Sequence, residues 1–186
     1  MVKQKILIIA GPTASGKSSL ALEIASLRPS IIVNADAFQV YKDLKILTAS
    51  PLEHEKKMAP HFLYNYLDIH EPYSVNIYIK HLLDLLNDKD RQDNSLIILV
   101  GGSHMYLHSL LYGLNEMPAI DAEIIKDTYE LWNKIGQDAF YQNLCELDPQ
   151  IINVIKPKDQ QRSIRAFTVK MQTSLSIIDY HKLHKA

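Results

Sequence analysis

The residues with the clearest chemical potential are residues 11–18 (GPTASGKS), which directly follow an apolar run ending at Ala10. They fit the pattern G-x-x-x-x-G-K-[ST], in which backbone N–H groups surround a di- or triphosphate. The N-terminal end of a following helix adds positive partial charge, Lys17 a full charge, and the Ser18 hydroxyl a ligand for Mg²⁺. A strand-to-helix turn without a ligand explains the glycines but leaves Lys17 and Ser18 unexplained. The predicted diphosphate-binding residues are Gly11, Thr13, Ala14, Ser15, Gly16, Lys17 and Ser18, and Ser18 is the predicted metal ligand.

Two further polar residues follow apolar runs that are typical of buried strands. Asp36 comes after residues 31–33, and Ser103 comes after residues 95–100 and two glycines. Ligands of open parallel sheets bind beyond the carboxyl ends of the strands, so we expect Asp36, Ser103 and the phosphate loop to converge. Asp36 suits a Mg²⁺-linked carboxylate or a general base, and Ser103 a hydrogen-bonding hydroxyl. Each is equally suited to cap a helix, which needs no further function.

The elements that must position these residues read as an α/β fold. Strands are expected near residues 4–10, 31–33, 66–69 and 95–100, with helices over 17–27 and from the N-cap Ser74 to Leu86. Residues 42–65 read as loop and short helix. After residue 103 every segment reads as helical, over 103–112, 121–134, 137–147, 149–155 and 160–172. We therefore predict a parallel sheet flanked by helices, like that of P-loop NTPases, over residues 1–113, and a partial helical lobe over 114–186.

Composition is that of an ordinary globular protein. The 186 residues are 47% hydrophobic and 22% charged, with a net charge of −1. The single cysteine, Cys145, excludes an internal disulfide and fits a reducing cytoplasm, where we expect the protein. No apolar run approaches the roughly 20 residues of a membrane span, and no signal peptide is expected before the first strand. Residues 156–186 are basic and the remainder acidic, which suits a local contact with a polyanion or simply a solvated helix face.

Four blocks of the sequence, in order and spread over essentially the whole chain, resemble the tRNA dimethylallyltransferases. They are residues 11–18, 36–41 (DAFQVY), 100–106 (VGGSHMY) and 159–166 (DQQRSIRA). The resemblance implies transfer of a dimethylallyl group from dimethylallyl diphosphate to N6 of adenosine-37 in the anticodon loop of tRNA, with Mg²⁺ as cofactor. The adenine must leave its stack to react, as single-stranded RNA bases do when they are read.

The resemblance also implies roles for individual residues. Asp36 would remove the proton from the adenine amine, Lys17 would stabilise the leaving diphosphate, and Ser103, where the family usually has Thr, would bond the adenine or the base. These three are the predicted catalytic residues. Arg162 and Arg165 share one helix face suited to phosphate contact, with solvation as the alternative. The predicted tRNA-binding residues are Asp36, Ala37, Phe38, Gln39, Ser103, Gln161, Arg162, Ser163, Ile164 and Arg165.

The sequence also departs from the family pattern. Ala37 replaces a Ser, residues 46–51 read ILTASP where the family has IGTAKP, and a Gly-Lys turn is missing near Ser174. Family members also continue well beyond Ala186. We expect the part beyond it to hold a further core strand, an Arg-bearing helix and more tRNA-binding surface. A truncated member with impaired activity is therefore expected, either as a monomer or complemented by a separate C-terminal chain.

Two other functions fit the phosphate loop. The first is a small-molecule kinase, but Arg28 and Arg91 are the only arginines before Arg162, and such kinases usually carry an arginine-rich lid. The second is an inactive remnant that binds diphosphate or tRNA. Phosphate transfer from ATP would identify the kinase, and binding without transfer would identify the remnant.

Overall fold

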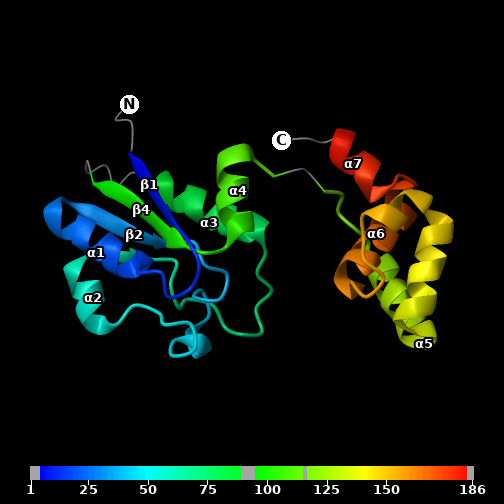
Figure 1. Cartoon of the computed structure of the whole chain (residues 1–186), viewed down its shortest axis with the longest axis horizontal. Helices are drawn as coiled ribbons and strands as arrows, with labels where there is room; N and C mark the ends of the chain where they lie inside the picture. Colours follow the sequence, from blue (N-terminus) through cyan, green and yellow to red (C-terminus); the bar gives the residue numbers. More distant parts are fainter. Residues whose placement is uncertain (1–4, 89–94, 115–116, 184–186) are drawn as a thin grey trace. The chain divides into compact units, whose positions relative to one another are not determined.

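The computed structural model of the chain (Figure 1) describes residues 5–88, 95–114 and 117–183. The chain divides into two compact units, Met1–Gly113 and Leu114–Ala186. Gln4, where the first strand is predicted to begin, Arg91 and part of the segment between the units lie outside the described residues.

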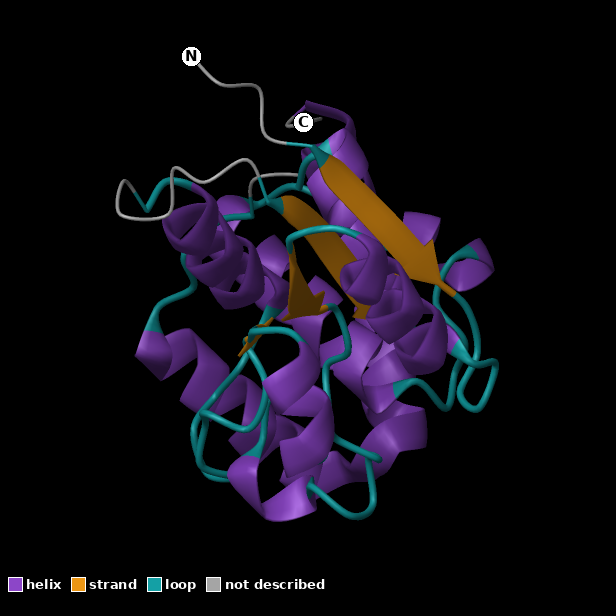
Figure 2. Ribbon diagram, turned by 90° about the vertical axis from the view of Figure 1, so that its left-hand side faces the viewer, coloured by secondary structure: helices purple, strands orange, loops and turns teal. Residues whose placement is uncertain are grey.

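The first unit contains a four-stranded parallel sheet, drawn in orange in Figure 2. Its strands lie in the order β1 (Ile6–Ala10), β4 (Leu96–Gly101), β2 (Ser30–Asn34) and β3 (His61–Phe62). Leu99 of β4 lies opposite Ile8 of β1 and Val33 of β2. The predicted α/β fold with a parallel sheet is confirmed.

Helices cover both faces of this sheet because its central strand is apolar on both sides. All six residues of β4 are buried. Ile98 and Val100 pack with residues of α1 (Lys17–Leu27) and with Ala59, which follows α2 (Glu53–Met58). Ile97 and Leu99 pack on the other side with α3 (Val75–Leu86) and α4 (His104–Tyr112). Figure 1 shows this layering, with α1 and α2 on one side and α3 and α4 on the other.

The predicted strand over residues 66–69 is wrong. The strand next to β2 is β3, only two residues long, and Leu67 forms no more than an isolated bridge with Tyr41. The amides of Tyr66 and Leu67 donate to Val40 O at 2.8 and 3.0 Å, so this segment runs beside residues 39–41 and not in the sheet. Residues 42–65 contain α2 and a short 3-10 helix, Lys42–Leu44, as predicted, but they also contain the strand β3, which the prediction of loop and short helix missed.

The predicted helix start at Ser74 is confirmed by its cap. Ser74 Oγ accepts a hydrogen bond from the Ile77 amide at 3.4 Å. An aromatic contact joins α3 to α4. Tyr78 of α3 stacks on Tyr106 of α4, with 4.2 Å between the ring centroids. Burial raises the pKa of the Tyr106 hydroxyl well above its ordinary value, so the ring stays neutral at the start of α4.

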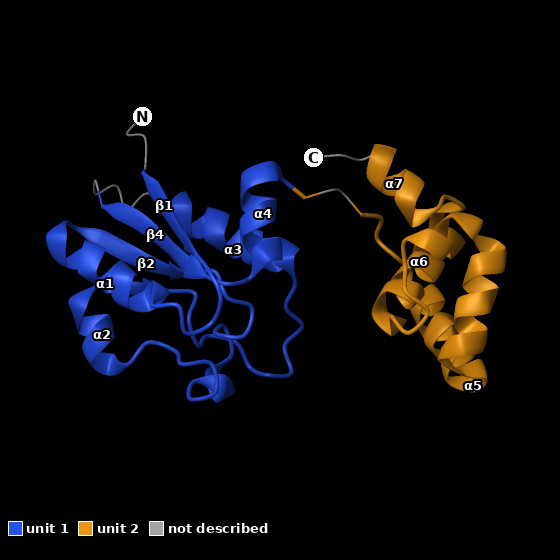
Figure 3. Ribbon diagram, viewed as in Figure 1, with its two compact units in different colours: residues 1–113 blue, residues 114–186 orange. Residues whose placement is uncertain are grey.

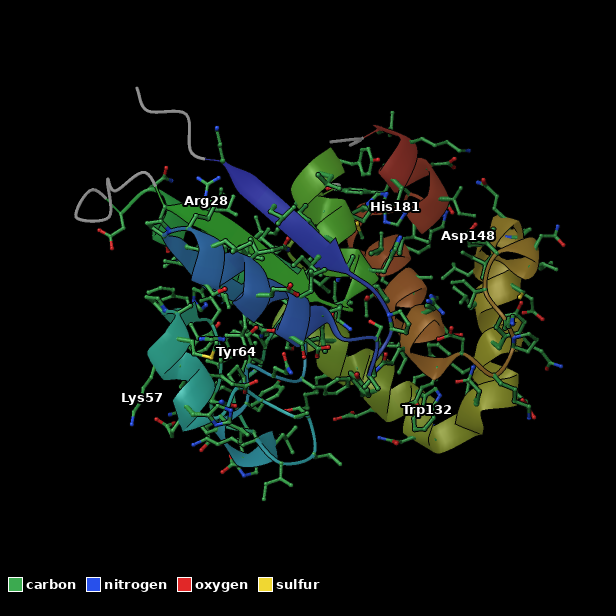
Figure 4. All side chains as sticks on the ribbon, turned by 60° about the vertical axis from the view of Figure 1, so that its left-hand side comes forward. Arg28, Lys57, Tyr64, Trp132, Asp148 and His181 are labelled. Carbon is green, nitrogen blue, oxygen red and sulfur yellow. The ribbon has the colours of Figure 1, made fainter. Side chains whose placement is uncertain are left out.

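The second unit is helical (Figure 3). Its elements are α5 (Ala122–Leu147), a 3-10 helix (Pro149–Asn153), α6 (Gln160–Thr173) and α7 (Ile177–Leu183). Gly136 has φ 77° and kinks α5, which is the break predicted between residues 134 and 137. Trp132, labelled in Figure 4, donates across the kink to Gln137 Oε1 at 2.8 Å. None of the helices described is long and apolar enough to cross a membrane.

The C-terminal end of this unit differs from expectation in two ways. Helix α7 is not predicted by the sequence pattern, which reads as helical only to residue 172. Ser174 occupies the left-handed region with φ 61° and ends α6 where the family pattern has a Gly, and its amide donates to Lys170 O. The left-handed turn that ends a helix therefore forms here without glycine.

The end of β4 gives a first test of this fold. A methyl group at Gly101 would overlap the carbonyl group of Ala35 and lie 2.7 Å from the Asp36 amide nitrogen. We expect Gly101→Ala to lower the free energy of unfolding of the first unit by about 3 kcal/mol, measured by far-UV circular dichroism in urea.

The matched control is Gly11→Ala, where the nearest atom to the new methyl group is the rotatable Ser15 hydroxyl at 3.1 Å. It should leave the unfolding transition nearly unchanged. Fluorescence of Trp132, the only tryptophan, reports on the second unit and should not change in either variant. Equal stability of Gly101→Ala and wild type would contradict the close approach of β2 and β4.

Candidate functional site

The phosphate loop has the conformation that its glycines and small residues permit. Ala14 and Gly16 lie in the left-handed region at φ 61° and 81°. Gly16 occupies the N-cap of α1, and no side chain caps this helix. The first-turn N–H groups therefore remain available to an anion. Lys17 Nζ donates to Pro12 O, so the ammonium folds back over the loop.

Asp36 lies in a loop that is held by Asn34, the last residue of β2. Asn34 is fully buried, accepts from the Asp36 amide at 2.8 Å, and donates to the carbonyl oxygens of Asp36 and Leu63 at 2.9 and 3.0 Å. Asp36 Oδ1 accepts from the Phe38 amide at 2.9 Å. No helix begins here, so the alternative role of Asp36 as a helix cap is wrong. Oδ2 accepts no hydrogen bond from the residues that the structure describes and is free to act on a ligand.

Ser103 ties the end of β4 to the Asp36 loop. It stands at the N-cap of α4, but its side chain makes no capping bond. Its hydroxyl instead accepts from the Ala37 amide at 2.8 Å, and its own amide donates to Ala35 O at 3.2 Å. The Ser103 side chain therefore does not cap α4, contrary to the alternative prediction. Its hydroxyl instead bonds to the loop that carries the Asp36 carboxylate.

One cavity of about 460 Å³ joins the phosphate loop to Asp36. One wall consists of the loop and the start of α1, and another of Asp36 and the end of β4. A third wall comes from the segment 38–49, in which Phe38, Leu44 and Leu47 supply a large apolar surface beside Gln39, Thr48 and Ala49. The convergence expected from the strand order is therefore present for the loop and Asp36. The residues of the first two walls are Thr13, Ala14, Ser15, Gly16, Lys17, Ser18, Ser19, Asp36, Val100 and Gly101.

The loop over residues 44–50 is held from within the first unit. The Gln39 amide group donates to Thr48 O at 2.9 Å and Ala49 O at 3.3 Å. Ser50, which replaces the family's Lys, is buried and donates to Asn65 Oδ1 at 3.0 Å. The Gln39 side chain thus supports this loop in the free chain, and its predicted tRNA contact stays a prediction.

The predicted tRNA-binding residues of α6 do not share one environment. Gln161 and Arg162 are exposed and Arg165 is half-buried, whereas Ser163 and Ile164 are buried. Ser163 Oγ donates to Asp159 O at 2.7 Å, inside the helical unit. The Ser163 and Ile164 side chains thus face the core of the helical unit, and the predicted tRNA contact of these two residues stays a prediction.

Arg162 is engaged by the residue that begins its own helix. Asp159 accepts from the Arg162 amide at 3.1 Å, and its carboxylate also pairs with the Arg162 guanidinium. The amide bond and then the guanidinium hold the pKa of Asp159 below its ordinary value. A phosphate that binds Arg162 must compete with this ion pair, whereas Arg165 has no such partner among the described residues.

Asn34 is the site residue that sequence reasoning missed. The signal was a polar residue at the end of an apolar strand, two positions before the candidate carboxylate. A buried polar side chain requires hydrogen-bond partners, so Asn at this position indicates a loop built around it. In the structure Asn34 bonds to the backbone of Asp36 and Leu63, so the loop that it holds is the one that carries Asp36.

The fold and the motif define an α/β protein of the P-loop NTPase type. The family model described as IPP transferase matches residues 39–186, and the chain belongs to this family. The tRNA dimethylallyltransferases of Pelagibacter ubique and Rickettsia bellii are each 40% identical to it, over 96% and 100% of this chain. The chain spans 56% and 58% of the length of these two relatives.

Solved structures agree with this assignment. A eukaryotic dimethylallyltransferase acting on tRNA matches 98% of this chain with 26% identity and a TM-score of 0.75, over 45% of its own chain. The full-length tRNA isopentenylpyrophosphate transferase of Bacillus halodurans matches 94% of this chain with 26% identity and a TM-score of 0.57, over 57% of its own chain.

The bond from Ala37 to Ser103 provides a test of the site geometry. In Ser103→Ala the Ala37 amide loses its acceptor, so its hydrogen exchange should accelerate about tenfold. Ser103→Thr keeps the hydroxyl and should retain wild-type protection. Amide-resolved exchange by NMR measures both, and unchanged protection of Ala37 in Ser103→Ala would contradict the bond.

Proposed function

We propose that this chain binds dimethylallyl diphosphate on the phosphate loop and transfers the dimethylallyl group to N6 of adenosine-37 in tRNA. The observation that carries the proposal is that the phosphate loop and the Asp36 carboxylate line the same cavity. Relatives named tRNA dimethylallyltransferase support the choice of reaction. No observation favours a kinase.

The adenine amine is a poor nucleophile, because its lone pair is delocalised into the ring. Its nitrogen forms a bond to C1 of the dimethylallyl group while the bond from C1 to the diphosphate oxygen breaks. Asp36 Oδ2 accepts the proton that the amine loses, while Oδ1 keeps its bond to the Phe38 amide and fixes the carboxylate. The electron pair of the broken bond leaves with the diphosphate.

Negative charge grows on the leaving diphosphate, so donors that face it contribute most in the transition state. The first-turn amides of α1 and the Lys17 ammonium supply these donors once Lys17 exchanges Pro12 O for a phosphate oxygen. This exchange keeps the ammonium hydrogen-bonded in both states.

A Mg²⁺ ion fits the donors at this end of the cavity. Mg²⁺ at phosphate sites takes one or two protein ligands and completes its shell with phosphate oxygens and water. The exposed Ser18 hydroxyl lines the cavity, and the described residues contain no cluster of three His, Cys, Asp or Glu that would hold a metal alone. Ser18 would hold the ion, which supplies positive charge to the leaving diphosphate.

The tRNA would contact both units in this proposal. Phe38 is 65% exposed at the cavity and can stack on an unpaired base. Gln161, Arg162 and Arg165 lie in the basic C-terminal segment, residues 156–186, and suit backbone phosphates. A cytoplasmic location follows from the tRNA substrate. The chain spans 56% and 58% of the length of the two relatives, and a separate C-terminal chain that complements it stays a prediction.

The proposal is tested by single-turnover transfer of label from dimethylallyl diphosphate to an unmodified tRNA in Mg²⁺. Asp36→Asn keeps the acceptor for the Phe38 amide but removes the base, so transfer should fall about 10²- to 10⁴-fold with diphosphate affinity unchanged. Lys17→Met removes a charged donor, so diphosphate affinity should fall about 10- to 100-fold.

The control substrate is the same tRNA with guanosine at position 37, which should accept no label. Transfer that survives in Asp36→Asn would contradict the role of this carboxylate. Phosphate transfer from ATP to a small molecule, without prenyl transfer, would favour the kinase. Diphosphate binding without any transfer would identify a binding remnant.

A further inference from the structure

The apolar wall of the cavity raises a question that phosphate binding does not answer. Phe38, Leu44 and Leu47 come from the segment after β2 and face the same cavity as the phosphate loop. Phe38 and Leu47 are 65% and 83% exposed. A site for bare diphosphate needs donors and positive charge but no apolar surface.

Leu47 and its neighbour Ile46 are both strongly exposed, but they differ in position. Ile46 is 99% exposed, but it does not line the cavity. Single exposed apolar side chains are common on protein surfaces and need no explanation. Leu47 is distinct because its side chain adjoins a cavity that contains the phosphate loop, and the family pattern has a Gly at this position.

The loop that carries Leu47 is fixed and can present the side chain reproducibly. Gln39 Nε2 donates to Thr48 O and Ala49 O, the two carbonyl oxygens that follow Leu47 in the chain. Thr48 Oγ1 donates to Leu44 O at 2.8 Å and lies 3.0 Å from Ser50 Oγ. Ala49 adopts a left-handed conformation with φ 49° and closes the turn.

We propose that Leu47, together with Phe38 and Leu44, covers the apolar tail of a diphosphate held on the phosphate loop. Leu47 is then a specificity-determining residue, which makes the site prefer a diphosphate with a short hydrocarbon tail over bare diphosphate. The inference rests on the proposed function for the diphosphate site and adds the residue that recognises the tail. Burial of a few methyl and methylene groups between ligand and Leu47 supplies the preference.

The test compares the affinity of the chain for dimethylallyl diphosphate and for inorganic diphosphate by titration calorimetry in Mg²⁺, without tRNA. Leu47→Ala should weaken dimethylallyl diphosphate about 5- to 10-fold and leave inorganic diphosphate unchanged. Leu47→Met keeps most of the apolar surface and should stay within about twofold of wild type.

Ile46→Ala is the matched control, since it removes a neighbouring exposed side chain that does not line the cavity. It should change neither affinity. Equal weakening of both ligands by Leu47→Ala, or no weakening of either, would overturn the inference and leave the proposed function standing. Failure of wild type to bind either diphosphate would overturn both.

Discussion

The close approach of the backbones of β2 and β4 at their carboxyl ends is the constraint on which the site depends. The Ala35 amide donates to Val100 O at 2.8 Å, and the Ser103 amide donates back to Ala35 O at 3.2 Å. A glycine at position 101 permits this approach, because a side chain would occupy the space of the Ala35 carbonyl group. Asp36 and Ser103 are neighbours for this reason, although 66 residues separate Ala37 from Ser103 in the bond that joins them.

The remaining parts of the site supply positive charge, a fixed carboxylate and apolar surface. Backbone donors and Lys17 provide the charge for a diphosphate, and Asn34 holds the loop that brings a carboxylate to the same cavity. Buried hydrogen bonds of this kind contribute modest net stability but are costly to leave unmade, so they fix one geometry. Phe38, Leu44 and Leu47 add apolar surface to the same cavity.

Most of the first unit could be predicted from the sequence, because its strands are long apolar runs and its motif is local. The phosphate loop, α1 and β4 depend on neighbouring residues alone. The third strand could not be predicted, since β3 is two residues long and Tyr66–Leu67, which look like a strand, bond to Val40 instead. Strand choice there depends on contacts between distant segments.

The outward or inward direction of single side chains was harder to predict. Ser163 and Ile164 sit inside a sequence block that resembles a tRNA-binding stretch, yet the helical period turns both into the core. The position of Asn34 and Ser103 at strand ends is visible in the sequence, but their hydrogen-bond partners are not, because these form only when the ends of two strands meet. The break between the helical segments 121–134 and 137–147, by contrast, was predicted correctly, and Gly136 forms the kink in α5 there.

The most direct test of the account is an NMR titration of the labelled chain with dimethylallyl diphosphate in Mg²⁺. One binding site joins the phosphate loop to the Asp36 loop, so amides of residues 14–18 and of residues 36–38 should shift together with one dissociation constant. Shifts confined to residues 14–18, or shifts in the helical unit alone, would contradict the claim that diphosphate and carboxylate share one site.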